Sequence, residues 1–225
     1  RDMIGIEGLR FRYPAAEGDF TLHIPRFELK TGERLAITGP SGTGKTTLLK
    51  LIAGIEPPMD GTIQVDGQAV HAMNDRARRR FRITRLGFIF QDLQLLDYLD
   101  MADNILHPYR INPALKLSPA VRQRMRQLAA DIGLEHKLSQ PVTALSQGER
   151  QRVAICRAVL TQPALVLADE PTASLDPDNK LKILDVLFRA LDRESASLIA
   201  VTHDHDLLGR FDRVIDFSAY HDAQA

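Results

Sequence analysis

A glycine-rich segment in the first quarter of the sequence has the composition of a phosphate-binding loop. It reads GPSGTGKTT over residues 39–47 and matches the pattern G-x-x-x-x-G-K-[ST]. Glycines let the backbone turn its N–H groups toward an anion, and the N-terminus of a following helix adds partial positive charge. Lys45 supplies a full positive charge, and the Thr46 hydroxyl is suited to Mg²⁺. We therefore predict that the phosphates of a nucleotide lie against Gly39, Pro40, Ser41, Gly42, Thr43, Gly44, Lys45, Thr46 and Thr47.

Two adjacent carboxylates follow a separate apolar run, in the segment LVLADEP. Asp169 stands at the expected end of a strand, where it is suited to hold Mg²⁺ through water. Glu170 follows directly and is suited to position or deprotonate a water that attacks the γ-phosphate. The structural alternative is a polar strand end capped by a proline turn, and the phosphate loop elsewhere in the chain favours the catalytic interpretation.

Two more polar residues stand at the ends of apolar runs. His203 ends SLIAVTH, and since neighbouring strand ends of a parallel sheet converge on one crevice, it is predicted to reach the γ-phosphate. Gln91 ends LGFIFQ and suits Mg²⁺ or the attacking water, with a surface glutamine as the alternative; chemistry alone does not choose between them. His203 and His205 have a metal-ligand spacing, but no cysteine or third histidine lies nearby, so we expect a helix to begin at His205 instead.

A second glycine- and serine-containing segment, ALSQGERQR, covers residues 144–152. Ser146 is a predicted helix N-cap, and Glu149 three residues later completes a capping box. The same helix N-terminus also suits an anion, with the Ser146 hydroxyl and the Gly148 N–H as donors. One nucleotide needs only one phosphate cradle, so the second anion site requires its own explanation.

The strands and helices predicted around these residues indicate an α/β core. Four short apolar runs, at residues 34–38, 164–169, 197–203 and 212–218, indicate buried strands covered on both faces. Helical patterns lie between them at residues 45–54, 147–162 and 178–195. A strand before the first glycine-rich segment and a helix after it are the context that phosphate binding needs.

Two regions depart from the strand–helix alternation. Residues of about 1–30 and 59–82 favour antiparallel strands, with VDGQ as an Asp-Gly hairpin. Residues of about 92–157 form a predicted helical insertion. We predict one domain, 1–225, whose remaining residues make the α/β core.

Composition narrows the possible partners and compartment. Lys plus Arg and Asp plus Glu both number 29, and this balance argues against general nucleic-acid binding, so no nucleic acid is expected. The single cysteine, Cys156, fits a reducing compartment and a buried position. No run approaches a membrane-spanning helix, and the first residues do not form a secretion signal, so we expect a cytoplasmic location.

Taken in their order along the chain, the segments described above resemble the motifs of the ATP-binding cassette (ABC) ATPases. GPSGTGKTT is similar to the Walker A motif, Gln91 to the Q-loop, LSQGE to the signature, LVLADE to Walker B, SLD at 174–176 to the D-loop and His203 to the H-loop. The resemblance extends over essentially the whole chain. It implies a P-loop NTPase (RecA-like) core with a mostly parallel sheet, an antiparallel β subdomain and a helical subdomain insertion.

The resemblance also implies roles within one chain. It implies a binding site for ATP and Mg²⁺ that is lined by Lys45, Thr46, Gln91, Asp169, Glu170 and His203. The residues implied in catalysis are Glu170, His203, Gln91 and Lys45. The residues implied at the metal are Thr46, Gln91 and Asp169. Tyr13 looks like the aromatic residue that stacks on adenine. Phe11 is its rival, and burial in a strand is the alternative for either.

The second anion site acquires a role from the same resemblance. In this family it binds the γ-phosphate held by another subunit, which implies a head-to-tail homodimer around two ATP molecules. Ser146 and Gly148 would act in trans, with Asp176 at the seam. Many relatives read LSGGQ where this chain has Gln147 and Glu149; Gln147 replaces the first glycine, and its effect on the kinetics is left open.

The resemblance to compact bacterial cassettes of the lipoprotein-release, macrolide-export and cell-division types predicts a membrane partner. We expect an ATPase subunit peripheral to the cytoplasmic face of the inner membrane, driving export, lipid or lipoprotein extraction, or mechanotransmission. A separate permease is expected to dock near Asp92–Ile105, on the apolar residues Leu93, Leu95, Leu96, Tyr98, Leu99 and Met101, half of which core packing explains equally well. The alternatives are an importer-type subunit and a non-transport cassette acting as an ATP-gated clamp; a P-loop kinase would leave LSQGE and His203 unexplained.

Overall fold

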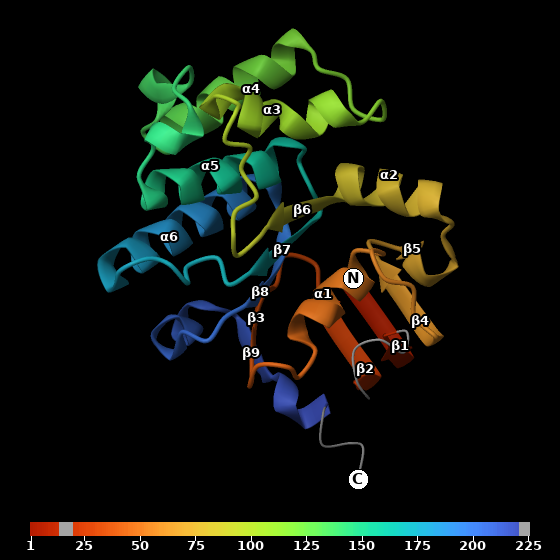
Figure 1. The fold of residues 1–225 in the computed structure, drawn as a ribbon. Helices are drawn as coiled ribbons and strands as arrows, with labels where there is room; N and C mark the ends of the chain where they lie inside the picture. The colour runs from red at the N-terminus through yellow and green to blue at the C-terminus, as the bar shows by residue number, and fades with distance from the viewer. Residues whose placement is uncertain (14–19, 221–225) are drawn as a thin grey trace. The chain divides into compact units, whose positions relative to one another are not determined.

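A computed structural model describes residues 1–13 and 20–220 of the chain. Residues 14–19, which fall within the segment predicted to be antiparallel, and residues 221–225 lie outside this description. The chain divides into two compact units (Figure 1). The first unit comprises Arg1–Arg82 and Ser197–Ala225, and the second comprises Ile83–Ala196.

The first unit contains an antiparallel sheet of four strands in the order β2-β1-β4-β5. Its strands are β1 (Asp2–Arg12), β2 (Thr21–Lys30), β4 (Asp60–Val65) and β5 (Gln68–Ala69). Ile4 and Ile6 are fully buried on one face of β1, and a register shift between Glu7 and Arg10, where Gly8 has a φ of 56°, leaves Leu9 buried as well. Asp66 and Gly67 join β4 to β5 with φ of 48° and 73°, the two positive values that a tight hairpin turn requires. The predicted Asp-Gly hairpin is confirmed.

The first unit also holds three parallel strands, with β3 (Arg34–Thr38) between β8 (Ser197–Val201) and β9 (Arg213–Asp216). Strands β3 and β8 are buried, as continuous apolar runs predict. Strand β9 was predicted to be buried on both faces, and this is wrong: Val214 is 42% exposed. The order β8-β3-β9 gives β9 one hydrogen-bonded neighbour, so it is an edge strand whose side chains remain accessible.

Two helices complete the first unit along the chain. Helix α1 (Lys45–Ile52) follows β3 and ends before Gly54, whose φ of 61° is the left-handed conformation common after a helix C-terminus. Helix α2 (Asp75–Arg85) extends across the boundary into the second unit. In both units, within the described residues, short 3₁₀ helices occur at Val70–Ala72, Glu135–Lys137, Val142–Ala144, His205–Arg210 and Phe217–Tyr220.

The second unit pairs two parallel strands and adds four helices. Strand β6 (Leu86–Ile89) pairs with β7 (Leu165–Asp169), from Leu86 opposite Leu165 to Ile89 opposite Ala168. The helices are α3 (Met101–Ile111), α4 (Pro119–Asp131), α5 (Gln147–Leu160) and α6 (Pro177–Glu194). Within the part of the chain that the structure describes, no helix is both long and apolar enough to cross a bilayer.

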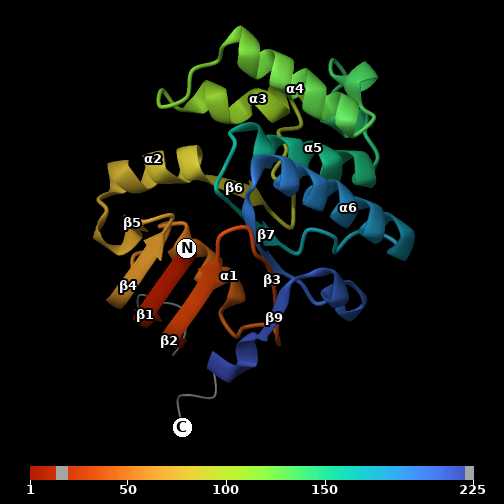
Figure 2. The ribbon, with the colours of Figure 1, turned by 180° about the vertical axis from the view of Figure 1, so that it is seen from behind.

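Helix α5 is the centre of the second unit. It packs against α3, α4, α6 and β6, and both views show it between the α3–α4 pair and α6 (Figures 1 and 2). Its apolar side is buried, comprising Val153, Ile155, Ala158, Val159 and Leu160. Each helix of this unit begins at a side chain that caps it, namely Asp100, Ser118, Ser146 and Asp176.

The connection between β6 and α3 has no regular structure of its own and is held by buried Asn104. The Asn104 carboxamide accepts a hydrogen bond from the Leu96 N–H (2.7 Å) and donates to the carbonyls of Leu96 (3.1 Å), Leu99 (3.3 Å) and Asp100 (3.0 Å). One side chain therefore satisfies several backbone groups of this loop, which would otherwise compete for water.

We expect Asn104→Ala to destabilise the protein by about 2–3 kcal/mol, because several buried polar groups lose their partner at once. The free energy of unfolding from urea titration measures this. Gln127→Ala is the control, since the exposed Gln127 amide reaches only Asp131 on the same helix, and its loss should cost less than about 0.5 kcal/mol. Equal effects of the two substitutions would contradict the assignment.

Candidate functional site

The predicted phosphate loop connects β3 to α1 and depends on glycine conformations. Gly39, Gly42 and Gly44 have φ of 131°, 82° and 98°, values that side chains rarely adopt. At Gly44 space is also lacking, because a Cβ atom would lie 2.8 Å from Cζ of Phe20. The N-cap residue of α1 is Gly44, which makes no side-chain capping bond, in contrast to the N-cap residues of α3–α6. The backbone N–H groups of this turn are therefore suited to an anion.

Lys45 lies inside this loop and is 6% exposed. Its Nζ donates hydrogen bonds to the carbonyls of Gly39 (2.7 Å) and Pro40 (2.6 Å), and the Thr43 hydroxyl donates to Pro40 O (2.9 Å). Asp216 at the end of β9 carries a negative charge nearby: its hydrogen bonds from Ser218, and then the charge of Lys45, lower the pKa of its carboxyl. The loop thus presents a buried ammonium group among backbone amides, which is suited to phosphate.

The two threonines after Lys45 lie in different environments. Thr46 is exposed, which suits a metal ligand, whereas Thr47 is buried and its hydroxyl lies 3.2 Å from the Tyr13 hydroxyl. Tyr13 is half-buried, and its ring meets that of Phe11 edge-on at 4.8 Å. Phe11 is 3% exposed, so of the two candidates for stacking on adenine, Tyr13 has the more accessible ring.

His203 belongs to the same unit as the phosphate loop. It follows β8, which ends at Val201, and its side chain is exposed. Because β3 and β8 are parallel, with Ile37 opposite Val201, the loop after β3 and His203 leave the same edge of these strands. The 3₁₀ helix that begins at His205 agrees with the predicted helix start, and no cluster of three or more His, Cys, Asp or Glu suited to a metal occurs in the described residues.

The second unit brings together the carboxylates and Gln91. Strands β6 and β7 are parallel, so exposed Gln91, after β6, and Asp169, at the end of β7, leave the same edge. Glu170 has φ of 50°, a left-handed conformation that costs a non-glycine residue about 1 kcal/mol and that concentrates at functional sites. The chain therefore bends sharply at the residue predicted to position the attacking water.

This bend is fixed by a residue that the sequence did not single out. Buried Gln151 of α5 donates from its side-chain amide to the carbonyl of Pro171, directly after Glu170. Its sequence signal is a polar residue at helical spacing from Ala154 and Ala158, on the buried side of the helix. Read that way, a glutamine on an apolar face indicates a buried hydrogen-bond partner.

The segment ALSQGERQR begins α5 with the predicted capping box. The Ser146 hydroxyl accepts from the Glu149 N–H (3.3 Å), and the Glu149 carboxylate accepts from the Ser146 N–H (2.9 Å). Lys137 contacts the other Glu149 oxygen at 2.6 Å, and its hydrogen bond is the main cause of a lowered pKa of that carboxyl. No sequence pattern indicated this contact, since Lys137 lies on a separate 3₁₀ helix.

Asp176, which was predicted to lie at a subunit seam, caps α6. Its carboxylate accepts from the Asn179 backbone N–H (3.1 Å) and side-chain amide (2.5 Å), and these bonds, the side-chain one first, lower the pKa of the carboxyl. Cys156 is 1% exposed, as expected, and burial raises its pKa to about 12. At neutral pH its thiol is therefore protonated and unsuited to nucleophilic chemistry.

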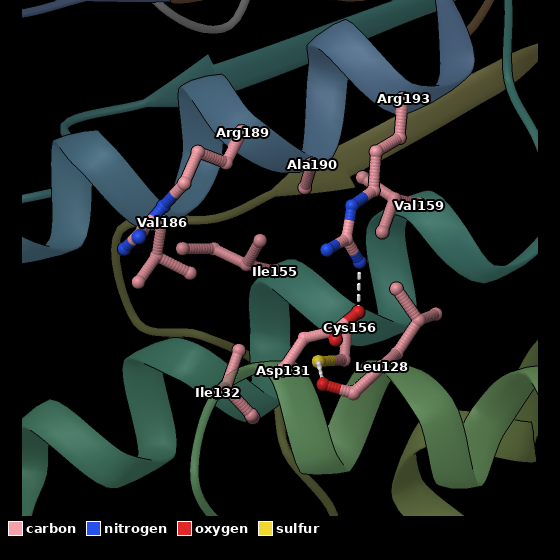
Figure 3. Close-up of a pocket in the computed structure, with 10 residues that line it drawn as sticks. All are labelled: Leu128, Asp131, Ile132, Ile155, Cys156, Val159, Val186, Arg189, Ala190 and Arg193. Atoms are coloured by element: carbon pink, nitrogen blue, oxygen red, sulfur yellow. Dashed lines mark hydrogen bonds and ion pairs between the residues drawn. The ribbon is translucent and has the colours of Figure 1, made fainter.

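A pocket of about 90 Å³ lies between α4, α5 and α6 (Figure 3). Ile155, Val159 and Val186 contribute apolar walls, while an ion pair between Arg193 and Asp131 crosses it. None of the predicted nucleotide-binding or catalytic residues lines it. The pocket therefore belongs to the packing of the helices and is no candidate for the phosphate chemistry.

We expect Gly44→Ala to destabilise the protein by about 2 kcal/mol and Gly42→Ala by about 1 kcal/mol. Both force alanine into a positive φ, but only at Gly44 must the Phe20 ring also move, since nothing lies within 4 Å of a Cβ at Gly42. Urea unfolding measures both, with Gly209→Ala as control because Gly209 has open space and no positive φ. A loss at Gly209 as large as at Gly44 would refute the conformational explanation.

Comparisons with known proteins identify the family of this chain. A family model described as "ABC transporter" matches residues 22–173. The "Lipoprotein-releasing system ATP-binding protein LolD" of Hydrogenovibrio crunogenus is 38% identical over 195 residues, covering 87% of this chain and 84% of that protein. The protein of the same name from Psychrobacter arcticus is 40% identical over 185 residues, covering 82% of this chain and 81% of that protein.

Solved structures of ABC cassettes share the fold of this chain. A dimeric post-hydrolysis state of the ATP-binding cassette MJ0796, bound to ADP and Pi, superimposes with a TM-score of 0.81 at 28% identity and covers 95% of this chain and 94% of that chain. The cassette cbiO1 from Clostridium perfringens gives a TM-score of 0.84 at 28% identity, covering 96% of this chain and 85% of that chain.

Proposed function

Since the chain belongs to the ABC transporter family and is an ATP-binding, ATP-hydrolysing cassette, we propose that two copies close head to tail around two Mg-ATP and drive a membrane partner. In this proposal each ATP lies between the phosphate loop of one copy and the N-terminus of α5 of the other. Hydrolysis then separates the copies, and the cycle of closing and opening moves the partner.

The residues of one chain have the chemistry that this cycle needs. Lys45 and the loop amides bind the β- and γ-phosphates, and Tyr13 stacks on adenine. Mg²⁺ would be held by Thr46, Gln91 and, through water, Asp169; their oxygen donors fit a hard cation, and the bound ion would neutralise charge at the phosphates. Glu170 orients and deprotonates the attacking water, and His203 contacts the γ-phosphate.

Gly148 is the single observation that carries the dimeric proposal. It has ordinary helical conformation, and nothing lies within 4 Å of where a Cβ would be. Within the chain, alanine would therefore be up to about 1 kcal/mol more favourable than glycine at this position. At the N-terminus of an α-helix such a glycine leaves the backbone open to an external group, and the helix end favours an anion there.

The names of the relatives point to lipoprotein release as the work of the complex, and we propose that activity for this chain. The membrane partner docks on the loop before α3, within Asp92–Ile105. Leu93, Leu95 and Met101 are buried, so the docking surface consists of the exposed parts of this loop, above all Tyr98, which is 81% exposed. A location on the cytoplasmic face of the membrane follows from this proposal.

We expect Glu170→Gln to abolish ATP turnover and to accumulate an ATP-dependent dimer, because the amide cannot accept the proton of the attacking water. Phosphate release and size-exclusion chromatography with and without ATP measure the two effects. Lys45→Ala in the same background is the control and should prevent the dimer by weakening nucleotide binding. A Glu170→Gln protein that stays monomeric at saturating Mg-ATP would contradict the sandwich.

Gly148→Ala should make the folded chain more stable and the ATP-dependent dimer weaker. We expect unfolding to become up to about 1 kcal/mol less favourable, while the ATP-dependent dimer of the Glu170→Gln protein weakens at least tenfold because a methyl group occupies the anion site. ATP binding to the monomer should stay within about twofold. Loss of monomer binding instead would mean that Gly148 serves the ATP site of its own chain.

A further inference from the structure

We propose that Lys137 is a positioning residue for the anion site at the start of α5: it holds and neutralises the Glu149 carboxylate so that a phosphate can approach Ser146 and Gly148. This inference rests on the proposed dimeric site and adds to it a residue outside the motifs. Lys137 acts through Glu149 and does not itself touch the nucleotide.

The geometry fixes both oxygens of Glu149. Oε1 lies 2.6 Å from Lys137 Nζ, and Oε2 accepts the Ser146 backbone N–H at 2.9 Å. The side chains of Lys137 and Glu149 are 24% and 16% exposed, so the contact is partly shielded from solvent. Lys137 is itself held by the short helix Glu135–Lys137, where its N–H donates to Leu134 O at 2.9 Å.

The contact also determines which groups remain for a ligand. Ser146 Oγ accepts from the Glu149 N–H, so its own hydroxyl proton is not used in the capping box and can be donated to an anion. With Oε1 engaged by Lys137, Glu149 uses Oε2 for the Ser146 backbone. The capping box and the lysine together therefore fix the backbone of the first turn in one arrangement.

The positive charge of Lys137 has an electrostatic role at the N-terminus of α5. A carboxylate in the first turn suits the helix dipole alone, but it is a like charge for a phosphate at the same N-terminus. The helix end offers about half a positive charge, which the full negative charge of Glu149 would outweigh. The positive charge of Lys137 offsets the negative charge of Glu149, so that the net charge at the helix N-terminus again favours phosphate. As a contribution to folding, a partly exposed pair of this kind changes the equilibrium constant by no more than about fivefold.

A neutral residue at position 149 would remove the need for the lysine. Glutamine keeps a capping acceptor for the Ser146 N–H and carries no charge. Glu149→Gln should therefore make Lys137 dispensable, whereas a lysine that only supports the fold would be missed equally in either background. This reversal separates a charge-balancing role from a structural one.

The experiment compares dimer dissociation constants at saturating Mg-ATP by analytical ultracentrifugation, all in the Glu170→Gln background. The variants are Lys137→Ala, Lys137→Arg, Glu149→Gln and the double substitution Lys137→Ala with Glu149→Gln, with Lys116→Ala as an exposed-lysine control. Thermal unfolding of each variant is recorded alongside. ATP binding to the monomer is measured separately.

We expect Lys137→Ala to weaken the dimer about tenfold per site, or about a hundredfold for two sites, which corresponds to about 1.4 kcal/mol at each. Lys137→Arg, Glu149→Gln, the double variant and Lys116→Ala should stay within about threefold of the parent. The defect of Lys137→Ala should also diminish at high salt, as screening predicts.

Two results would overturn the inference. One is a dimer unaffected by Lys137→Ala; the other is a double variant as weak as Lys137→Ala, which would indicate a structural role. A parent protein that fails to dimerise with ATP would instead refute the proposed function, and this inference with it. The parent measurement thus distinguishes the two failures.

Discussion

The second unit depends on hydrogen bonds from side chains of α5 to the backbone of segments that have no regular structure. Gln151 holds the carbonyl after Glu170, and Arg157 donates to the carbonyls of Leu93 and Gln94, at 2.6 and 2.7 Å. Leu93 and Gln94 both have positive φ, so their conformation needs such support. Arg157 itself is largely desolvated, which lowers its pKa, and its carbonyl partners offset the loss of water.

The consequence is that the signature segment, the bend at Glu170 and the loop after Gln91 are attached to one rigid body. The N-terminus of α5 carries the proposed trans phosphate site, while Arg150 near that end contacts Asp97 at 3.3 Å, beside the exposed Tyr98. Short, direct contacts therefore join this loop to α5. In the proposed complex they would connect a partner docked on the loop with the N-terminus of α5, within a single unit of the chain.

Sequence reasoning predicted the local backbone features well, because they depend on neighbours along the chain. The phosphate loop, the Asp-Gly hairpin at Asp66 and the capping box at Ser146 each have a pattern only a few residues long. The contacts that failed to be predicted join distant segments. Lys137 reaches Glu149 from another helix, Gln151 reaches Pro171 across 20 positions, and β9 is an edge strand only because of the order in which the strands pair. Such contacts are set by tertiary packing, so a local pattern such as the glutamine on the apolar face of α5 indicates at most that a buried partner exists and does not identify it.

The isolation of Cys156 has a practical consequence for following the protein in motion. It is the one cysteine of the sequence, it is buried, and its raised pKa keeps the sulfur protonated and unreactive. A cysteine introduced at an exposed position such as Tyr98 would then be the sole thiol available to a fluorescent or spin label, without removing the natural one. The chain is thus ready for distance measurements between two labelled copies, and such distances would report directly on the opening and closing of an ATP-bound pair.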